Sequence, residues 1–224
     1  MLKKNRATPW KSGKVISICL RNGVYILAQM VREPYLVFFN HFNEENNWKG
    51  VTLKEEDILF CKAVTRQFLR YSPVAIIKEV NPLLDYELPK EWIYSHIGGH
   101  NITISVKGRE RQVVGFGQRC SLVLADKDSG QPEDNPLMGL FQSYIIPDIK
   151  EQDWDRVGQA ELMSIEVFPT LNERLYLCFL YGKNINPEQD ISLGKPLPDD
   201  YETYIDILTN SPEARRLYLE EHEE

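Results

Sequence analysis

The sequence has no long hydrophobic run and lacks the marks of a secreted or membrane protein. No apolar stretch among its 224 residues approaches the roughly 20 residues that a membrane-spanning helix needs. The basic start, MLKKNRATPW, is not followed by the apolar segment of a secretory signal. We therefore expect a cytoplasmic protein with no membrane partner.

Cysteine is scarce, and its spacing does not suit metal binding. The four cysteines each lie inside an apolar segment typical of a strand: Cys19, Cys61, Cys120 and Cys178. None of them forms a C-x-x-C pair, and their spacing fits no zinc ribbon. The pattern predicts reduced, buried thiols that act as small apolar side chains.

Histidine is equally scarce, with four residues, and no G-x-S-x-G nucleophile elbow occurs. His96 and His100 are four residues apart, which on a helix would put both rings on one face. The glycines between them disfavour a helix, and no glutamate accompanies them as in H-E-x-x-H. We predict no catalytic residue, no metal and no cofactor. Two alternatives stay open: a small metal-dependent hydrolase centred on His96 and His100, and a Ser–His or Cys–His pair that only geometry would reveal.

Positive charge is in deficit. Against 26 lysines and arginines stand 33 aspartates and glutamates, which gives a net charge of −7. Direct nucleic-acid binding needs a cationic surface that displaces phosphate counterions, so we expect none. The same balance suits an acidic face that docks onto a basic partner, although it also serves solubility alone.

Apolar residues are plentiful, at 42% of the chain, and their pattern in the first part favours strands. Residues 15–31 form a predicted hairpin, because Asn22-Gly23 suits the positive φ angles of a tight turn. A third strand at residues 35–42 follows. Residues 58–64 favour a further strand, although the charges on either side would also suit a short helix. After a tail at residues 1–9, residues 10–80 are expected to form a small bent sheet or an SH3-like barrel.

A proline-punctuated connector at residues 81–94 is expected to separate this part from a second β-rich domain at residues 95–224. We predict one hairpin around Lys107-Gly108 and another that joins residues 160–168 to residues 174–182. A helix starting near Ser211 closes the chain. The predicted fold is mostly β, in the α+β class, with a second β-rich half and a C-terminal helix.

The stretch YLVFFNHF, residues 35–42, is apolar on both faces of its predicted strand. A central strand buried on both sides explains this pattern. The alternative is one face left open for a partner or for a second copy, which would make the protein a self-associating structural adaptor.

The stretch WKSGKVISICLRNGVYILAQMVREPYLVFFNHF, followed by ILFCKAVTRQFL, resembles the Immunity-26 family of bacterial polymorphic-toxin systems. The likeness covers roughly residues 10–70. It implies a cytoplasmic immunity protein that neutralises a cognate toxin by direct binding. Some relatives carry a phosphotriesterase label, but that chemistry usually needs a two-metal site that opens with H-x-H, and the sequence has no H-x-H.

Together these observations predict a non-catalytic binding protein whose partner is a toxin, for example a basic nuclease. Acidic charge would steer the encounter, and aromatic side chains would anchor it. The expected contacts are aromatic residues and acidic residues in or near residues 35–56: Tyr35, Phe39, Trp48, Glu44, Glu45, Glu55 and Glu56.

Overall fold

The computed structural model describes residues 8–96, 101–116, 119–125 and 143–209. The chain divides into two units that interleave along the sequence. The first unit consists of residues 1–87, 164–186 and 200–224, and the second of residues 88–163 and 187–199. The first boundary falls within the expected connector, but two later segments return to the first unit, so the units are not consecutive halves of the chain.

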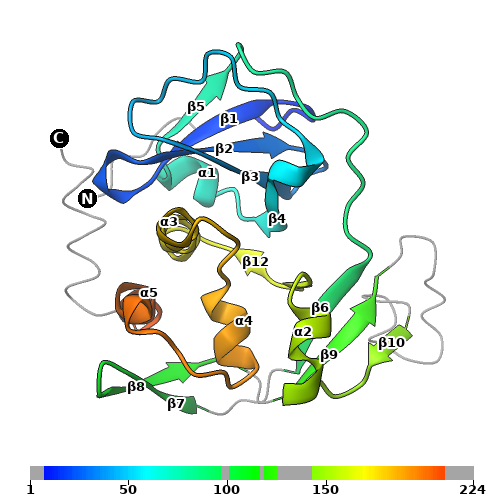
Figure 1. Ribbon diagram of the computed structural model, residues 1–224, viewed down its shortest axis with the longest axis vertical. Helices are drawn as coiled ribbons and strands as arrows, with labels where there is room; N and C mark the ends of the chain where they lie inside the picture. Colours follow the sequence, from blue (N-terminus) through cyan, green and yellow to red (C-terminus); the bar gives the residue numbers. More distant parts are fainter. Residues whose placement is uncertain (1–7, 97–100, 117–118, 126–142, 210–224) are drawn as a thin grey trace. The chain divides into compact units, whose positions relative to one another are not determined.

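The first unit contains a six-stranded sheet (Figure 1). Neighbouring strands are antiparallel except for β12, which runs parallel to β4. The order across the sheet is β12 (Ile165–Glu166), β4 (Ile58–Val64), β3 (Tyr35–Asn43), β2 (Tyr25–Met30), β1 (Val15–Cys19) and β5 (Val74–Ile77).

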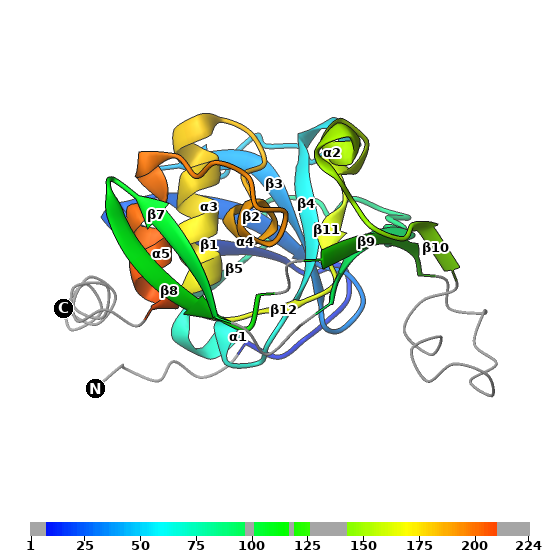
Figure 2. The same ribbon diagram turned by 90° about the horizontal axis from the view of Figure 1, so that it is seen from below.

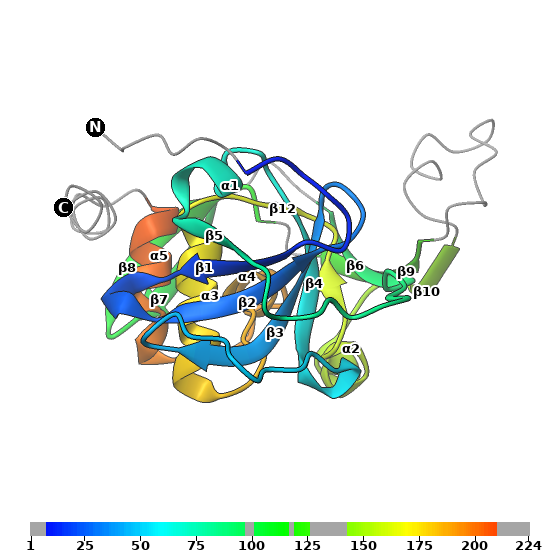
Figure 3. The same ribbon diagram turned by 90° about the horizontal axis from the view of Figure 1, so that it is seen from above.

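The predicted mostly β, α+β fold is confirmed by this sheet and by those of the second unit. Of the two expected versions of the first part, the sheet is the open one, since β12 and β5 end its strand order. Figure 3 shows its strands side by side. The first unit also contains short helices and turns: η1 (Arg21–Gly23), η2 (Glu55–Asp57), α1 (Phe68–Tyr71) and α5 (Glu202–Leu208), with η4 (Asp199–Tyr201) leading into α5.

The hairpin β1–β2 forms where the sequence predicts it. Asn22 has φ 59° and Gly23 has φ 69°, the left-handed conformations that a tight hairpin turn needs. Asparagine and glycine accept this conformation at little cost, so the turn sets the register that pairs Ile18 with Ile26.

The largest departure from the sequence-based expectation is residues 170–181, which form the helix α3 (Thr170–Tyr181) and not the second strand of a hairpin. The apolar run in this segment fits a buried strand and a buried helix equally well by periodicity. The signals that favour the helix lie at its ends. Pro169 precedes the first turn, and Gly182 ends the last turn with φ 63°.

Helix α3 lies against one face of the first sheet. Figures 2 and 3, which view the sheet from opposite sides, show the helix on a single side of β1–β3. The guanidinium of Arg174 lies 3.7 Å from the ring centre of Phe60, and the rings of Phe42 and Phe179 are 5.4 Å apart. The helix therefore packs against the row of the sheet that contains Phe60 and Phe38, whose rings are 4.8 Å apart.

An ion pair ties the helix to the hairpin turn η1, which precedes it by more than 100 residues. Arg21 donates from Nε and Nη2 to the two carboxylate oxygens of Glu173, at 2.9 and 3.1 Å. The Glu173 side chain is fully buried, whereas that of Arg21 is 18% exposed. The same guanidinium lies 3.8 Å from the ring centre of Tyr176, whose hydroxyl accepts a hydrogen bond from Asn22. The hairpin turn is thus fixed to the helix by charge as well as by packing.

A second group of buried charges holds the returning segment on β4. Lys62 donates from Nζ to the hydroxyl oxygen of Ser164 at 2.9 Å and lies 3.8 Å from a carboxylate oxygen of Glu166. Arg174 lies 3.7 Å from the same oxygen and donates to the backbone carbonyl of Ile185. Lys62 and Arg174 can be buried because carboxylate, hydroxyl and carbonyl oxygens lie within reach of their charged groups.

Loops cover the other face of the first sheet. Gln29 forms two hydrogen bonds with the backbone of Leu83, which seats the segment before the second unit on β2. Residues 36–39 of β3 are consequently buried. The interpretation of YLVFFNHF as a central strand covered on both sides is confirmed for residues 36–39, whereas Asn40 is exposed.

The second unit contains two separate sheets and two short helices. Its core is an apolar cluster that includes Ile93, Leu122 and Val157. A four-stranded sheet has the order β10 (Ser143–Ile146), β9 (Arg119–Leu124), β6 (Glu91–His96) and β11 (Glu161–Leu162), and the expected hairpin pairs β7 (Asn101–Val106) with β8 (Arg109–Val114). The helical segments are η3 (Glu151–Asp153), α2 (Trp154–Val157) and α4 (Pro187–Ser192).

The expected strand at residues 160–168 is divided between the units. β11 runs parallel to β6 in the second unit, and β12 runs parallel to β4 in the first. The helix predicted from Ser211 lies outside the described residues. No helix in the described part of the chain is long and apolar enough to cross a bilayer.

We expect Arg21→Ala to destabilise the protein far more than a matched surface change. Removing the guanidinium strips the buried carboxylate of Glu173 of its bidentate partner, which costs about 3 kcal/mol of unfolding free energy. The control is Arg66→Ala, because Arg66 and Glu33 are 91% and 51% exposed and such pairs contribute only about 0.5 kcal/mol. Urea unfolding followed by circular dichroism measures both variants. Equal losses would show that the Arg21–Glu173 pair does not fix the helix.

Candidate functional site

Two of the three aromatic residues expected at a partner surface are inside the protein. Phe39 is 0% exposed and Trp48 is 1% exposed. The Trp48 ring donates from Nε1 to the side-chain oxygen of Asn46 at 2.7 Å, and the hydroxyl of Ser17 on β1 donates to the same oxygen at 2.5 Å. Trp48 therefore holds its loop on the sheet, and neither ring is available to a partner.

Tyr35, the third expected aromatic contact, is only half-buried. It begins β3 and pairs with Ala63 of β4. Burial is the main cause that raises the pKa of its phenol. The residue keeps part of its ring accessible, but no other expected aromatic contact lies beside it on the surface.

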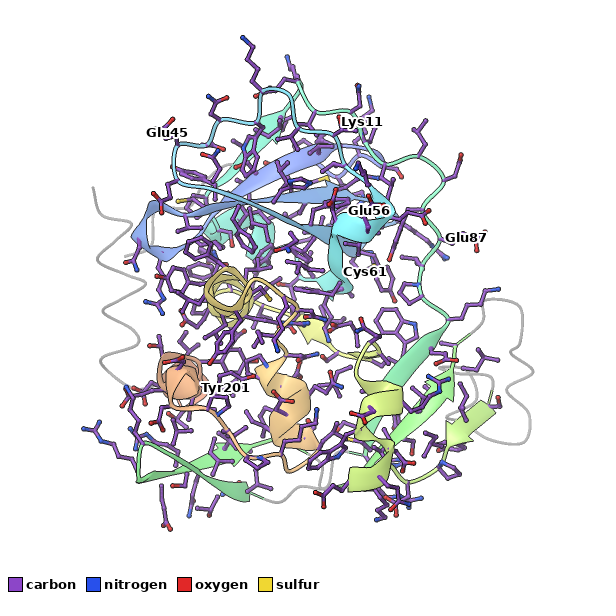
Figure 4. The ribbon with its side chains drawn as sticks, viewed as in Figure 1. Lys11, Glu45, Glu56, Cys61, Glu87 and Tyr201 are labelled. Carbon is purple, nitrogen blue, oxygen red and sulfur yellow. The ribbon has the colours of Figure 1, made fainter. Side chains whose placement is uncertain are left out.

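The four expected acidic contacts are all exposed, and they form two sites. Glu44 and Glu45 follow the end of β3, whereas Glu55 and Glu56 belong to η2 just before β4. β4 begins at Ile58, which pairs with Phe39, four residues before the last residue of β3. Figure 4 shows Glu45 and Glu56 well apart on the first unit.

The Glu55–Glu56 site is partly neutralised by its own neighbours. Lys54 donates from Nζ to Glu56 at 3.2 Å, with the two side chains 59% and 74% exposed. Asp57 lies 3.0 Å from Nε2 of His41 and also accepts a hydrogen bond from the backbone of Lys54. The ammonium of Lys54 thus partly neutralises Glu56, and the His41 ring and the Lys54 backbone N–H contact Asp57.

The Glu44–Glu45 site presents its charge to solvent. Among the described residues neither glutamate forms an ion pair. The backbone N–H of Glu45 donates to the side-chain oxygen of Asn43 at 2.6 Å, which shapes the turn that leaves β3. Both carboxylates therefore remain available to a cationic partner.

The end of helix α3 lies against β3, and the sequence did not predict it. Asn40 on β3 donates to the backbone carbonyl of Gly182 at 3.3 Å, and the Phe42 ring contacts Phe179. Leu180 is 50% exposed and Tyr181 is 38% exposed. Predicting a strand in place of the helix concealed these two residues, because the strand pattern assigned them to a buried hairpin.

His96, proposed in the hydrolase alternative, does form a contact with a serine. Its Nε2 lies 2.8 Å from Oγ of Ser121 on β9, the residue that pairs with Tyr94, two positions before His96 on β6. However, Ser121 donates its own hydroxyl proton to the backbone carbonyl of Pro147 at 2.6 Å. Nε2 of His96 must then be the donor to Oγ, which is the reverse of what a general base for serine requires.

The remaining requirements of that alternative are also not met by the described residues. His100 lies outside them, and among them no group of three histidine, cysteine, aspartate or glutamate side chains is placed to hold a metal ion. The four cysteines are free thiols, and burial raises the pKa of Cys120 to about 11. A thiol with this pKa is protonated at neutral pH and is a poor nucleophile.

One family model matches the chain. The model described as a domain of unknown function (DUF8309) matches residues 4–117. This range includes Glu44, Glu45 and the strands β1–β8, and it ends before β12 and α3, which complete the first unit. Comparison with curated proteins and with solved structures finds no match.

We expect His96 to make the protein less stable in mild acid. Burial, and secondarily Arg119, lower the pKa of His96, so folding favours its neutral form. Its contribution is therefore complete above the unfolded pKa of about 6.5 and is lost as the pH falls through the lower folded pKa. The His96→Gln variant keeps an N–H donor for Ser121 but does not titrate.

Urea unfolding of both proteins between about pH 7.5 and pH 5 measures this effect. The stability of the wild type relative to the variant should be constant at the upper end and should fall toward the lower end. A difference that is independent of pH, or that grows in acid, would contradict the expected linkage.

Proposed function

The chain belongs to the DUF8309 family, and we propose that it is a non-catalytic binding protein, an immunity protein that neutralises a cognate bacterial toxin in the cytoplasm. The family description names no activity. The proposal rests on the resemblance of residues 10–70 to Immunity-26 proteins and on the chemistry that the first unit presents to solvent.

The observation that carries the proposal is the exposure of all four expected acidic side chains on a unit whose sheet is covered on both faces. With the net charge of −7, these carboxylates favour a basic partner surface, for example that of a nuclease. Complementary charge raises the rate of encounter and excludes partners of like charge.

Catalysis finds less support in the geometry. The hydrogen bonds of Ser121 point its proton at Pro147 and not at His96. Self-association through the apolar strand β3 also finds little support, because α3 and the loops cover its faces. Binding through exposed rims and turns is the function that fits the described surface best.

The test is to mix the purified protein with the toxin domain encoded beside its gene. We expect a stable complex by size-exclusion chromatography and loss of toxin activity at equimolar ratio. The association rate should fall by about tenfold or more between low and physiological salt, because exposed charges steer the encounter.

The matched variant carries glutamine in place of Glu44, Glu45, Glu55 and Glu56. It should associate more slowly and show a much weaker dependence on salt, while its melting temperature stays close to that of the wild type, since the four side chains are exposed. Full toxin activity in the presence of excess wild-type protein would refute the proposed function.

A further inference from the structure

The edge strand β5 directs some of its backbone hydrogen-bonding groups away from the first sheet. In an antiparallel pair, residues that exchange backbone hydrogen bonds with the partner strand alternate with residues that do not. The backbone N–H of Cys19 donates to the carbonyl of Pro73 at 2.9 Å, and this bond continues the register of β1 and β5. Every second residue after Pro73 therefore bonds to β1. The N–H and C=O groups of Val74 and Ile76, which lie between those residues, point outward.

These outward groups are accessible to an added strand. In the described part of the chain, no hydrogen bond reaches the backbone of Val74 or Ile76 from this side. Ile76 is 47% exposed and Ala75 is also exposed. Figure 3 shows β5 next to β1 at the edge of the sheet. Edge strands avoid further pairing through charged side chains, prolines or bulges, and Val74–Ile77 has none of these.

The opposite edge of the same sheet is closed. β12 pairs with β4 over only two residues. The carbonyl of Val167, the next residue, accepts hydrogen bonds from the backbone of Leu171 and from the hydroxyl of Thr170, both at 3.0 Å. The start of α3 thus takes up a group that an added strand would need. Ile165 at this edge is 60% exposed, so the open backbone and not the exposed side chain distinguishes β5.

The described edges of the second unit are less suited to accept a strand. β10 contains a register shift, and β11 has two residues. β8 includes three charged side chains, and the exposed side chains of β7 are all polar. An added strand would find no apolar cross-strand neighbour on β7, whereas Ile76 provides one on β5.

The loop that follows β3 places acidic side chains near β5. Ser17 of β1 pairs with Ala75, so the two side chains lie on the same face of the sheet, with Cβ atoms about 5 Å apart. The hydroxyl of Ser17 donates to the side-chain oxygen of Asn46 at 2.5 Å, which seats the loop on this face. Glu44 and Glu45 come just before Asn46, and both are exposed. A strand added to β5 therefore meets negative charge on the face that contains Ser17.

We infer that β5 pairs with an extended basic segment of the toxin, whose strand then lengthens the first sheet. This inference rests on the proposed function and specifies its contact. The outward groups of Val74 and Ile76 exchange hydrogen bonds with the backbone of the segment. Ile76, which shares the face of α3, contacts an apolar side chain of the segment. Lysine or arginine side chains on the other face lie near Glu44 and Glu45.

A second copy of this chain is the competing occupant of the edge, and it fits less well. It would bring its own net charge of −7 and its own Glu44–Glu45 loop toward the same strand, and like charges oppose association. A pair of four-residue strands also buries far less than the roughly 1,200 Å² of a stable interface. A basic segment removes the repulsion, and the rest of the toxin supplies further area.

Amide hydrogen exchange followed by NMR tests the pairing directly in the wild-type protein. In the free protein the amides of Val74 and Ile76 should exchange fast, and those of Ala75 and Ile77 more slowly, because only the latter two bond to β1. Binding of the toxin domain encoded beside the gene should slow the two outward amides by about tenfold or more. The two inward amides should change much less.

A proline variant tests the same contact through affinity. Ile76→Pro removes an N–H that points out of the sheet, so the fold should persist, while binding measured by surface plasmon resonance should weaken by about tenfold or more. Ile165→Pro is the matched control. Its N–H also points away from the sheet, because the neighbouring Glu166 is the residue that bonds to β4. The control should leave the affinity within about twofold, and melting temperatures verify that both variants are folded.

Charge variants test the basic character of the segment. Glu44→Gln with Glu45→Gln should reduce the association rate more than Glu55→Gln with Glu56→Gln. The second pair comes just before β4, which three strands separate from β5. Equal effects of the two pairs would contradict a basic segment at β5.

The outcomes separate this inference from the proposed function. A wild-type complex that leaves Val74 and Ile76 unprotected, or that Ile76→Pro and Ile165→Pro weaken equally, would overturn the β5 contact while the immunity function stands. Protection of these amides when the free protein is concentrated would assign the edge to a second copy and would also overturn it. Absence of any wild-type complex would overturn both.

Discussion

The position of helix α3 depends on a charge that is entirely out of water. Glu173 sits fully buried in the first turn of the helix, and its carboxylate accepts hydrogen bonds from Nε and Nη2 of the Arg21 guanidinium. A buried carboxylate tolerates few placements, because a position away from the arginine loses the positive charge that offsets the cost of its desolvation. The pair therefore specifies where the helix meets the hairpin turn. It links two segments that are 152 residues apart.

Once α3 is seated, the rest of the first unit follows. The helix covers the row of the sheet that contains Phe38 and Phe60, and the loops anchored by Trp48 and Gln29 cover the opposite face. A sheet closed in this way has no open apolar face to offer. What remains accessible are its turns and the ends of its elements, which is where binding loops usually lie. Exposed apolar side chains occur at such places, for example Leu180 at the end of α3 and Leu84 in the segment after β5.

In the second unit, the hydrogen bond that the Ser121 hydroxyl donates shows whether its contact with His96 is structural or catalytic. His96 and Ser121 are within hydrogen-bonding distance, as a nucleophile and its base would be. Because Ser121 gives its proton to Pro147, the chain of hydrogen bonds runs from histidine to serine to carbonyl. It joins β6 and β9 to the backbone that follows β10. This hydrogen-bond chain stabilises the second unit locally, and it does not activate Ser121 as a nucleophile.

The amino-acid sequence by itself determined the local features. Asn22-Gly23 specified the first hairpin turn, and the alternating and apolar runs specified β1–β3 and the hairpin β7–β8. The double-sided apolar pattern of residues 35–42 favoured a central strand. These depend on backbone preferences and nearest neighbours, which a sequence carries directly. The four exposed glutamates also follow from local polarity.

Only the tertiary structure decided the long-range features. Residues 174–182 are apolar enough for a strand or a helix, and the burial of Glu173 and Arg174 against distant partners resolves that ambiguity. Trp48 and Phe39 look like surface anchors until the sheet and its loops enclose them. The return of residues 164–186 to the first unit depends on pairing with β4 across about 100 residues. Such contacts leave no local pattern, because each is specified by the complementarity of two segments and not by either one.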